Sequence, residues 1–347
     1  MSISLNGTNG VVFPDLSTQN TAATGFGFKS RIINGAMVID QRNNGAAVNP
    51  AVAGNYYTDR WNYNSTQSSK LSVQQNAGAV TSPTGFTNYL GFTSLSNYSV
   101  LTGDAFFLAQ YVEGFNTTDL AWGTANATAV TLSFRVYSSL TGTFGGSFSN
   151  SAQNRSYPFT YSVPIANTWT TVAVTVPGDT TGTWLTNNGA GLRIFFGLGA
   201  GATFSGTAGA WAGATYWSAT GAVSVVGTSG ATFYITGVQL EKGSTATSFD
   251  YRDYGRELIM CQRYGQLLTQ EKRLNAASAS GTYVDLISFF PMRATPTQTL
   301  VSAGTVFNMS QSTISPVTNY STQSNYVNNT SGDAYITNRV YFLSAEL

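Results

Sequence analysis

Three aromatic side chains whose chemistry suits sugar binding lie within one stretch of small residues, Gly206–Thr220. They are Trp211, Tyr216 and Trp217. Flat aromatic rings can stack on the apolar faces of pyranose rings, while nearby amides and hydroxyls bind the sugar hydroxyls. Because the stretch is too long and too rich in glycine for a strand, we expect a surface loop that binds carbohydrate through these rings.

Two further tryptophans have similar settings and are also candidate carbohydrate-binding residues. Trp122 follows Asp119, and Trp184 precedes Asn187 and Asn188. The alternative for each of the four loop tryptophans is packing against the core, which is the commoner role of this large apolar side chain in a sandwich.

A polar segment adds Arg155 and Tyr157 to the candidate binding residues. A guanidinium group at Arg155 could bind an anionic sugar, since its planar fork of donors matches a carboxylate. The alternative, which we favour for Arg60, Arg155 and Arg193, is an ion pair with an isolated carboxylate such as Asp59.

Catalysis by the common nucleophilic and zinc-dependent routes is excluded by composition. The chain has no histidine and a single cysteine, so a Ser-His-Asp site, a Cys-His site and a zinc site with histidine ligands cannot form. Glycan cleavage by two carboxylates remains as an alternative, with candidates Asp104, Glu113, Asp119 and Asp179. Since acidic residues are scarce and Glu113 and Asp179 have the context of turn residues, we expect no enzymatic activity.

The charge balance indicates which partners the chain can have. There are 16 basic and 15 acidic residues among 347, and charged residues are 9% of the chain. No basic cluster indicates nucleic-acid binding, and a neutral surface rich in hydroxyls and amides favours hydroxyl-rich ligands. A calcium ion could be held by Asp side chains and carbonyls, but no acidic cluster requires one, so we expect no metal and no cofactor.

Neither the N-terminus nor any later segment suggests secretion or membrane insertion. Met1–Gly7 lacks a basic start followed by an apolar run, and no apolar stretch approaches membrane-spanning length. We therefore expect synthesis in the cytoplasm. Cys261 falls on the apolar stripe of an expected helix, which predicts a buried thiol.

The strand pattern predicts an all-β protein. Turn residues recur about every 8 to 12 residues, and the segments 130–137 and 169–176 alternate apolar and polar side chains. Phe233–Leu240 alternates as well, with a slip at Gly237 that predicts a bulge. A helix with Tyr254, Leu258 and Cys261 on one stripe is expected from about Tyr254 to Leu268.

These elements predict four parts of the chain. Residues 1–30 form an N-terminal arm for attachment and trimerisation, in which Val11, Val12 and Phe13 from several copies are buried together; the alternative is a frayed tail. Residues 31–250 form a jelly-roll β-sandwich resembling carbohydrate-binding modules. Residues 251–270 contain the linking helix, and residues 271–347 form a smaller C-terminal β domain that begins with a linker at 271–281.

Two blocks resemble a known family. The stretch YITGVQLE…CQRY, Tyr234–Tyr264, together with FPMRATPT at Phe290–Thr297, is similar to blocks of phage tail-fibre and receptor-binding proteins, and the likeness extends over roughly residues 31–297. The resemblance implies host recognition at a virion tail, a homotrimer, and attachment to a tail, baseplate or adaptor protein.

Three functions follow, in order of preference. The first is a structural receptor-binding protein that recognises a host surface polysaccharide through aromatic-lined loops. The second is a glycan-degrading tailspike enzyme, which the scarcity of carboxylates disfavours. The third is a carbohydrate-binding module of a secreted bacterial protein, which the N-terminal sequence disfavours.

Overall fold

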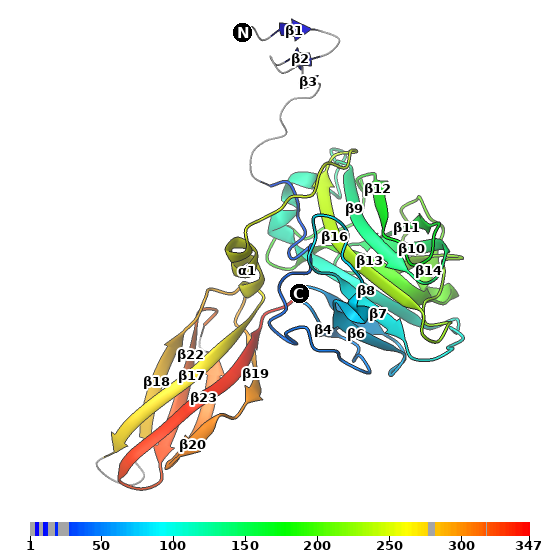
Figure 1. Ribbon diagram of the computed structural model, residues 1–347. Coiled ribbons are helices and arrows are strands. Elements are labelled where there is room, and N and C mark those ends of the chain that lie inside the picture. Colours follow the sequence, from blue (N-terminus) through cyan, green and yellow to red (C-terminus); the bar gives the residue numbers. More distant parts are fainter. Residues whose placement is uncertain (1–3, 7–9, 13–17, 20–27, 277–281, 317) are drawn as a thin grey trace.

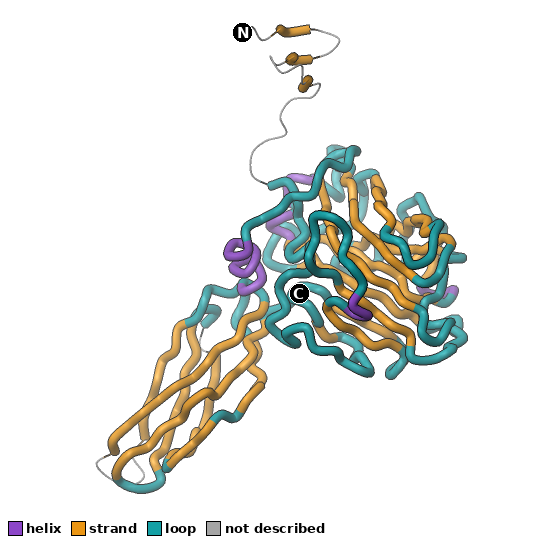
Figure 2. The backbone as a smooth tube through the Cα atoms, viewed as in Figure 1, coloured by secondary structure: helices purple, strands orange, loops and turns teal. Residues whose placement is uncertain are grey.

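The computed structural model describes residues 4–6, 10–12, 18–19, 28–276, 282–316 and 318–347. Nearly all of the regular structure in this part of the chain is antiparallel strand, arranged as a large sandwich and a smaller elongated β unit with one α-helix between them (Figures 1 and 2). The predicted all-β fold with a jelly-roll-like sandwich is confirmed.

One layer of the large sandwich is a sheet of six antiparallel strands. In spatial order they are β11 (Ser156–Val163), β10 (Gly142–Ser149), β13 (Ala190–Ala200), β8 (Ala105–Glu113), β5 (Asn62–Ser65) and β4 (Asn55–Tyr56).

The other layer is a sheet of five antiparallel strands. In spatial order they are β12 (Thr170–Val176), β9 (Val130–Ser138), β16 (Thr232–Lys242), β7 (Leu90–Ser94) and β6 (Leu71–Gln75). Alternation along β9 shows why these segments are strands: Leu132, Phe134 and Val136 are fully buried, whereas Ser133 and Arg135 face outward and are half-buried. The buried side chains of both sheets form one core.

The bulge predicted at Gly237 is confirmed. Pairing of β16 with β9 shifts register between Thr236 and Gln239, and Gly237 has a φ of +61°. A glycine adopts this left-handed conformation without the steric penalty that a Cβ would bring.

The helix is shorter than predicted. Helix α1 spans Tyr254–Gln262, and the side chain of Asp253 caps its N-terminus by accepting a hydrogen bond from the backbone N–H of Arg256 at 2.9 Å. The predicted extension to Leu268 is wrong, because strand β17 (Gly265–Ala276) begins three residues later. Its residues alternate between buried and exposed and pair with β23 (Gly332–Ser344), so strand pairing determines the local structure there. Cys261 on the helix is buried, as predicted.

The smaller β unit is a second sandwich. One sheet contains β17, β23, β19 (Thr297–Ser302) and β20 (Thr305–Phe307), and the other contains β18 (Thr282–Ser288), β22 (Ser321–Asn328) and β21 (Met309–Pro316). The linker predicted at 271–281 is wrong over 271–276, which belong to β17; residues 277–281 lie outside the described residues.

Short strands also occur within residues 1–30. Strands β1 (Ser4–Asn6), β2 (Gly10–Val12) and β3 (Thr18–Gln19) form a three-stranded antiparallel sheet. Phe13 and much of the predicted N-terminal arm lie outside the described residues.

Candidate functional site

Three of the predicted binding tryptophans meet at one place on the large sandwich, and we call them the tryptophan cluster. Trp122 follows a 3-10 turn after β8, Trp184 lies between β12 and β13, and Trp211 lies between β14 (Ser205–Gly206) and β15 (Ser218–Ala219). The ring centroid of Trp122 lies 4.7 Å from that of Trp184 and 5.4 Å from that of Trp211, and the centroids of Trp184 and Trp211 lie 5.5 Å apart. All three pairs are edge-to-face, the arrangement that aromatic quadrupoles favour.

Backbone carbonyls orient each indole ring of the cluster. The Nε1–H groups of Trp122, Trp184 and Trp211 donate to the carbonyl oxygens of Thr128, Thr181 and Pro177 at 2.7, 3.1 and 2.9 Å. Trp122 is 8% exposed, whereas Trp184 and Trp211 are half-buried. The rings are therefore anchored at one edge and still partly accessible to solvent.

Tyr157 and Arg155, the other two predicted residues of this region, extend the cluster. The Tyr157 ring centroid lies 5.2 Å from that of Trp211, and the guanidinium of Arg155 lies 6.0 Å from the same ring. Arg155 also binds Asp179 through two hydrogen bonds of 2.7 and 2.8 Å. Burial alone would raise the pKa of Asp179, but the hydrogen bonds from Arg155 and Thr181 outweigh it and lower that pKa. The ion pair favoured for Arg155 from the sequence is thus present, with Asp179 as the partner.

A pocket of about 180 Å³ opens between Trp122 and Trp184, and we call it the tryptophan pocket. Its wall combines the two indoles with threonine hydroxyls and a few aliphatic groups; the lining includes Thr117, Thr118, Thr124, Leu185, Thr186 and Leu192. An apolar wall with hydroxyls around it is the composition that a sugar ring requires.

Trp217 and Tyr216 lie apart from this cluster, although they share with Trp211 the predicted loop, which here is the segment between β14 and β15. The Trp217 ring stacks on Phe204 at 4.1 Å and lies 4.8 Å from Phe107, on the outer side of the six-stranded sheet. The Tyr216 ring lies against Gly206, where a Cβ would come within 2.3 Å of it. Ala212, next to Trp211, pairs with Ser156 at the start of β11, whereas the backbone N–H of Trp217 donates to the carbonyl oxygen of Phe204 at 2.9 Å.

The four carboxylates considered for catalysis each have separate partners. Asp104 accepts hydrogen bonds from Tyr98, Leu101, Thr66 and Gln67, and Asp119 binds Arg31 at 2.7 Å. Glu113 binds Arg263 and Tyr264, and Asp179 binds Arg155. No contact among the described residues joins any two of them.

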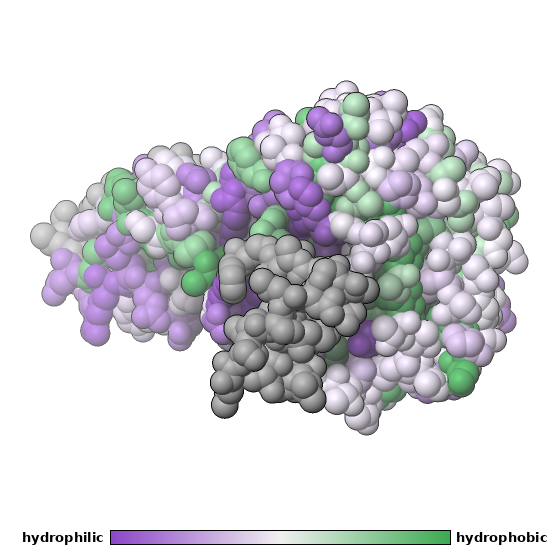
Figure 3. Space-filling view, turned by 90° about the horizontal axis from the view of Figure 1, so that it is seen from above, coloured by the Kyte–Doolittle hydropathy of each residue, from purple (hydrophilic) through white to green (hydrophobic). Residues whose placement is uncertain are grey.

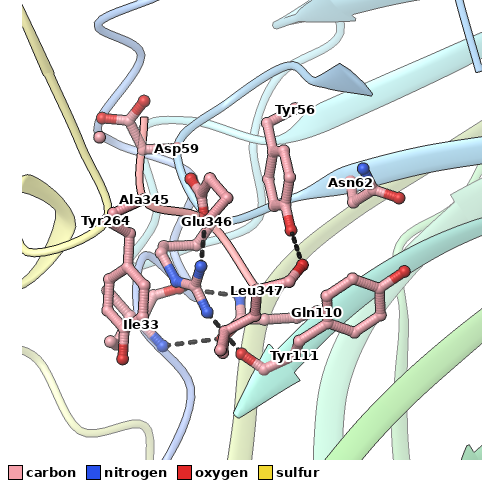
Figure 4. A network of polar contacts seen from close by, with 12 residues as sticks. Ile33, Tyr56, Asp59, Asn62, Gln110, Tyr111, Tyr264, Ala345, Glu346 and Leu347 are labelled. Atoms are coloured by element: carbon pink, nitrogen blue, oxygen red, sulfur yellow. Dashed lines mark hydrogen bonds and ion pairs between the residues drawn. The ribbon is translucent and has the colours of Figure 1, made fainter. Parts of the chain in front are cut away.

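A network of charged groups, the interdomain network, joins the two β-sandwiches (Figure 4). Arg60 is completely buried; its guanidinium lies 3.6 Å from the ring centroid of Tyr264 and binds the carboxylate of Glu346. Arg42 binds both Glu346 and Asp59 at 2.9 Å. Burial raises the pKa of Asp59 to about 6 against the opposing effect of Arg42. The sequence predicted an ion pair of Arg60 with a carboxylate such as the adjacent Asp59. The structure instead pairs Arg60 with Glu346, 286 residues later.

Arg293, the arginine of the FPMRATPT block, makes a second set of contacts between the two sandwiches. It donates to the carbonyl oxygens of Asn188, Ala345 and Glu346 at 2.7, 2.6 and 2.7 Å. Sequence reasoning found the block but not this contact, because the contact depends on how two distant parts of the chain dock.

Among the described residues, no group of three or more acidic or cysteine side chains comes together as a metal site. No helix among these residues is both long and apolar enough to span a membrane.

The surface of the large sandwich is dominated by weakly polar residues in one view of the molecule, while stronger hydrophilic residues gather over the smaller β unit (Figure 3). This agrees with the low content of charged residues, 9%, in the whole sequence.

No protein-family model matches the chain, and no curated protein matches it either. Among solved structures, the enzymatically active domain of tailspike protein 4 of bacteriophage CBA120 is similar, with a TM-score of 0.33 and 12% identity over 61% of this chain. The match covers about a fifth (21%) of the tailspike chain. A family 11 carbohydrate-binding module from Clostridium thermocellum, in complex with a mixed-linked tetrasaccharide, gives a TM-score of 0.29 and 11% identity over 58% of this chain and 99% of that one.

The N-terminal cellulose-binding domain of a β-1,4-glucanase from Cellulomonas fimi is similar with a TM-score of 0.26 and 12% identity, over 47% of this chain and 82% of that one.

Proposed function

We propose that the chain recognises a polysaccharide, and that the tryptophan pocket binds one of its sugar rings. The observation that carries this proposal is the tryptophan cluster, in which backbone carbonyls orient three indoles, and two of these, Trp122 and Trp184, line a pocket of about 180 Å³ together with threonine hydroxyls. Rings that are already oriented lose little conformational freedom on binding, so more of the contact energy appears as affinity.

The role we propose is non-catalytic. Asp104, Glu113, Asp119 and Asp179 are each held by their own partners, and Asp119 and Asp179 by arginines that keep a carboxylate ionised. A general acid for glycan cleavage needs a raised pKa at its carboxyl group. The pKa values of Asp104, Asp119 and Asp179 are instead lowered.

Within this function, we propose a receptor-binding protein of a phage tail. This rests on the resemblance of Tyr234–Tyr264 and Phe290–Thr297 to phage tail-fibre proteins, and it includes a homotrimer bound to a tail, baseplate or adaptor protein. A trimer would present three pockets to a repeating polymer and raise its apparent affinity without new contacts. Light scattering tests this, and a mass of 36.8 kDa at micromolar concentration would contradict it.

The test of the glycan site is to fill the pocket without removing core packing. Thr186 is exposed and lines the tryptophan pocket, so Thr186→Trp should block the pocket. For a polysaccharide that the wild-type protein binds, we expect the affinity to fall at least about tenfold, the effect of losing roughly 1.4 kcal/mol. Thr228→Trp is the matched control, because Thr228 is also exposed but does not line the pocket.

Binding would be measured on an array of bacterial surface polysaccharides, together with released reducing ends. Equal binding by wild type and Thr186→Trp would show that the glycan site lies elsewhere. Release of reducing ends by the wild-type protein would contradict the non-catalytic role, and the four carboxylates would then be neutralised one at a time.

A further inference from the structure

A second pocket, lined by Arg193 and separate from the tryptophan cluster, lies on the outer side of the six-stranded sheet. We call it the Arg193 pocket; its volume is about 140 Å³. Arg193 projects from β13 between Tyr111 of β8 and Ser149 of β10, its neighbours in register. The lining residues are Asn64, Ser65, Thr66, Phe107, Tyr111, Gln153, Arg193 and Trp217.

Arg193 has no carboxylate partner among the described residues, which corrects the ion pair expected from the sequence. The guanidinium lies 5.0 Å from the ring centroid of Tyr111, and its Nε–H is buried with no protein acceptor. A buried donor without an acceptor costs free energy, and more so when it is charged. The pocket therefore holds a positive group that no carboxylate of the described residues neutralises.

Other donors line the same pocket. Gln153 accepts the Nε1–H of Trp217 through its Oε1 at 2.6 Å, which leaves its amide NH₂ available as a donor. Asn64 uses its Oδ1 to accept the backbone N–H of Ser65 at 2.8 Å, which likewise leaves an NH₂ group. Guanidinium and amide donors together suit a planar anion.

Aromatic rings provide the other half of a sugar site. Trp217, Phe107 and Tyr111 line the pocket beside the guanidinium, and the first two have centroids 4.8 Å apart. Cationic and amide donors next to aromatic rings match a ligand that has both a negatively charged group and an apolar ring face.

We propose that the Arg193 pocket binds the carboxylate of an acidic sugar residue, which deepens the proposed glycan recognition and rests on it. The volume of about 140 Å³ suits a single sugar unit and not a longer chain. Arg193 holds the carboxylate, and Trp217 orients the sugar ring.

Two loops connect the Arg193 pocket to the tryptophan cluster. The turn between β10 and β11 carries Gln153 to the Arg193 pocket and Arg155 to the tryptophan cluster. The segment between β14 and β15 carries Trp217 to the pocket and Trp211 to the cluster. One polysaccharide with neutral and acidic units would engage both sites through the same two loops.

The test compares sugar acids with their uncharged esters. Glucuronate, galacturonate and N-acetylneuraminate would be titrated against the full chain beside their methyl esters, with tryptophan fluorescence and calorimetry as readouts. We expect at least one acid to bind about tenfold or more tightly than its ester. Arg193→Gln should remove that difference, and added NaCl should reduce it.

The variants separate this proposal from the proposed function. Arg193→Gln should leave the binding of a neutral polysaccharide unchanged, whereas Thr186→Trp should lower it and leave the preference for the acid intact. If Thr186→Trp did not lower the binding of the neutral polysaccharide, the tryptophan pocket would be contradicted as the glycan site. The proposal for the Arg193 pocket would stand as long as the preference for the acid depended on Arg193.

Three outcomes would overturn the assignment to an acidic sugar. The acids and esters could bind equally, which would mean that Arg193 is satisfied by water. The preference for the acid could survive Arg193→Gln, which would place it elsewhere. Inorganic phosphate or sulfate could bind as tightly as the acids, which would mean that the pocket takes any anion.

Discussion

Asp104 shows how hydrogen bonds set the charge state of a single residue. It accepts hydrogen bonds from Tyr98 Oη at 2.6 Å, from the Leu101 backbone N–H and Gln67 Nε2 at 2.9 Å, and from Thr66 Oγ1 at 3.1 Å. Burial alone would raise the pKa of Asp104, but these donors outweigh it and lower that pKa to about 2.

The lowered pKa of Asp104 predicts a dependence of stability on pH. A carboxyl group whose pKa is depressed by folding stabilises the folded state above its unfolded pKa of about 3.9, and this contribution is lost as the pH falls toward 2. Asp104→Asn should lower the free energy of unfolding at pH 7 by about 1–3 kcal/mol and reduce the loss between pH 4 and pH 2. Urea unfolding at both pH values measures this, and an unchanged acid sensitivity in the variant would contradict it.

At the residue scale, the sequence identified the aromatic and arginine residues but not their groupings. Trp122, Trp184 and Trp211 come together from three separate loops, and Trp217 leaves the group although it is only six residues from Trp211. Composition and local spacing cannot predict such groupings, because they depend on contacts between strands that are far apart in the chain.

At the scale of elements, the bulge in β16 depends on one glycine. Gly237 has a φ of +61°, and a Cβ added there would lie 2.6 Å from the Phe86 ring. Gly237→Ala should lower the free energy of unfolding by more than the roughly 1 kcal/mol that a left-handed conformation costs alone. Gly230→Ala is the control, since Gly230 has a φ of +77° but open space around its Cβ position. Equal losses in the two variants, measured by thermal unfolding, would show that Phe86 moves without cost.

Strand alternation was a better guide to these elements than helical periodicity. The bulge at Gly237 was predictable because a break in period two appears directly in the sequence. The end of α1 was not, because Gly265–Ala276 becomes a strand by pairing with residues 332–344, and this long-range pairing overrides the local pattern.

For the whole molecule, the interdomain network predicts that one residue near the C-terminal end of the sequence stabilises the large sandwich. Glu346→Ala would leave Arg60, 1% exposed, without its carboxylate. Removing one partner of a buried ion pair typically costs about 3–5 kcal/mol. We expect a loss of that size, or separate unfolding transitions for the two sandwiches, in calorimetry.

The control for this variant is an exposed ion pair. Asp333→Ala removes the partner of Arg273, whose side chain is 77% exposed, and should change stability by less than about 1 kcal/mol. If Glu346→Ala were as mild as Asp333→Ala, the docking of the two sandwiches would have to depend on other contacts, such as those of Arg293.

The pairing of Arg60 with Glu346 also bears on how the protein is made. A ribosome synthesises Arg60 long before Glu346, so the nascent sandwich contains an arginine whose buried position still lacks its counter-ion. Until residue 346 leaves the ribosome, solvent or another acidic group must accompany that guanidinium. The ion pair of Arg60 is therefore completed only after the strands of the second β unit have been synthesised.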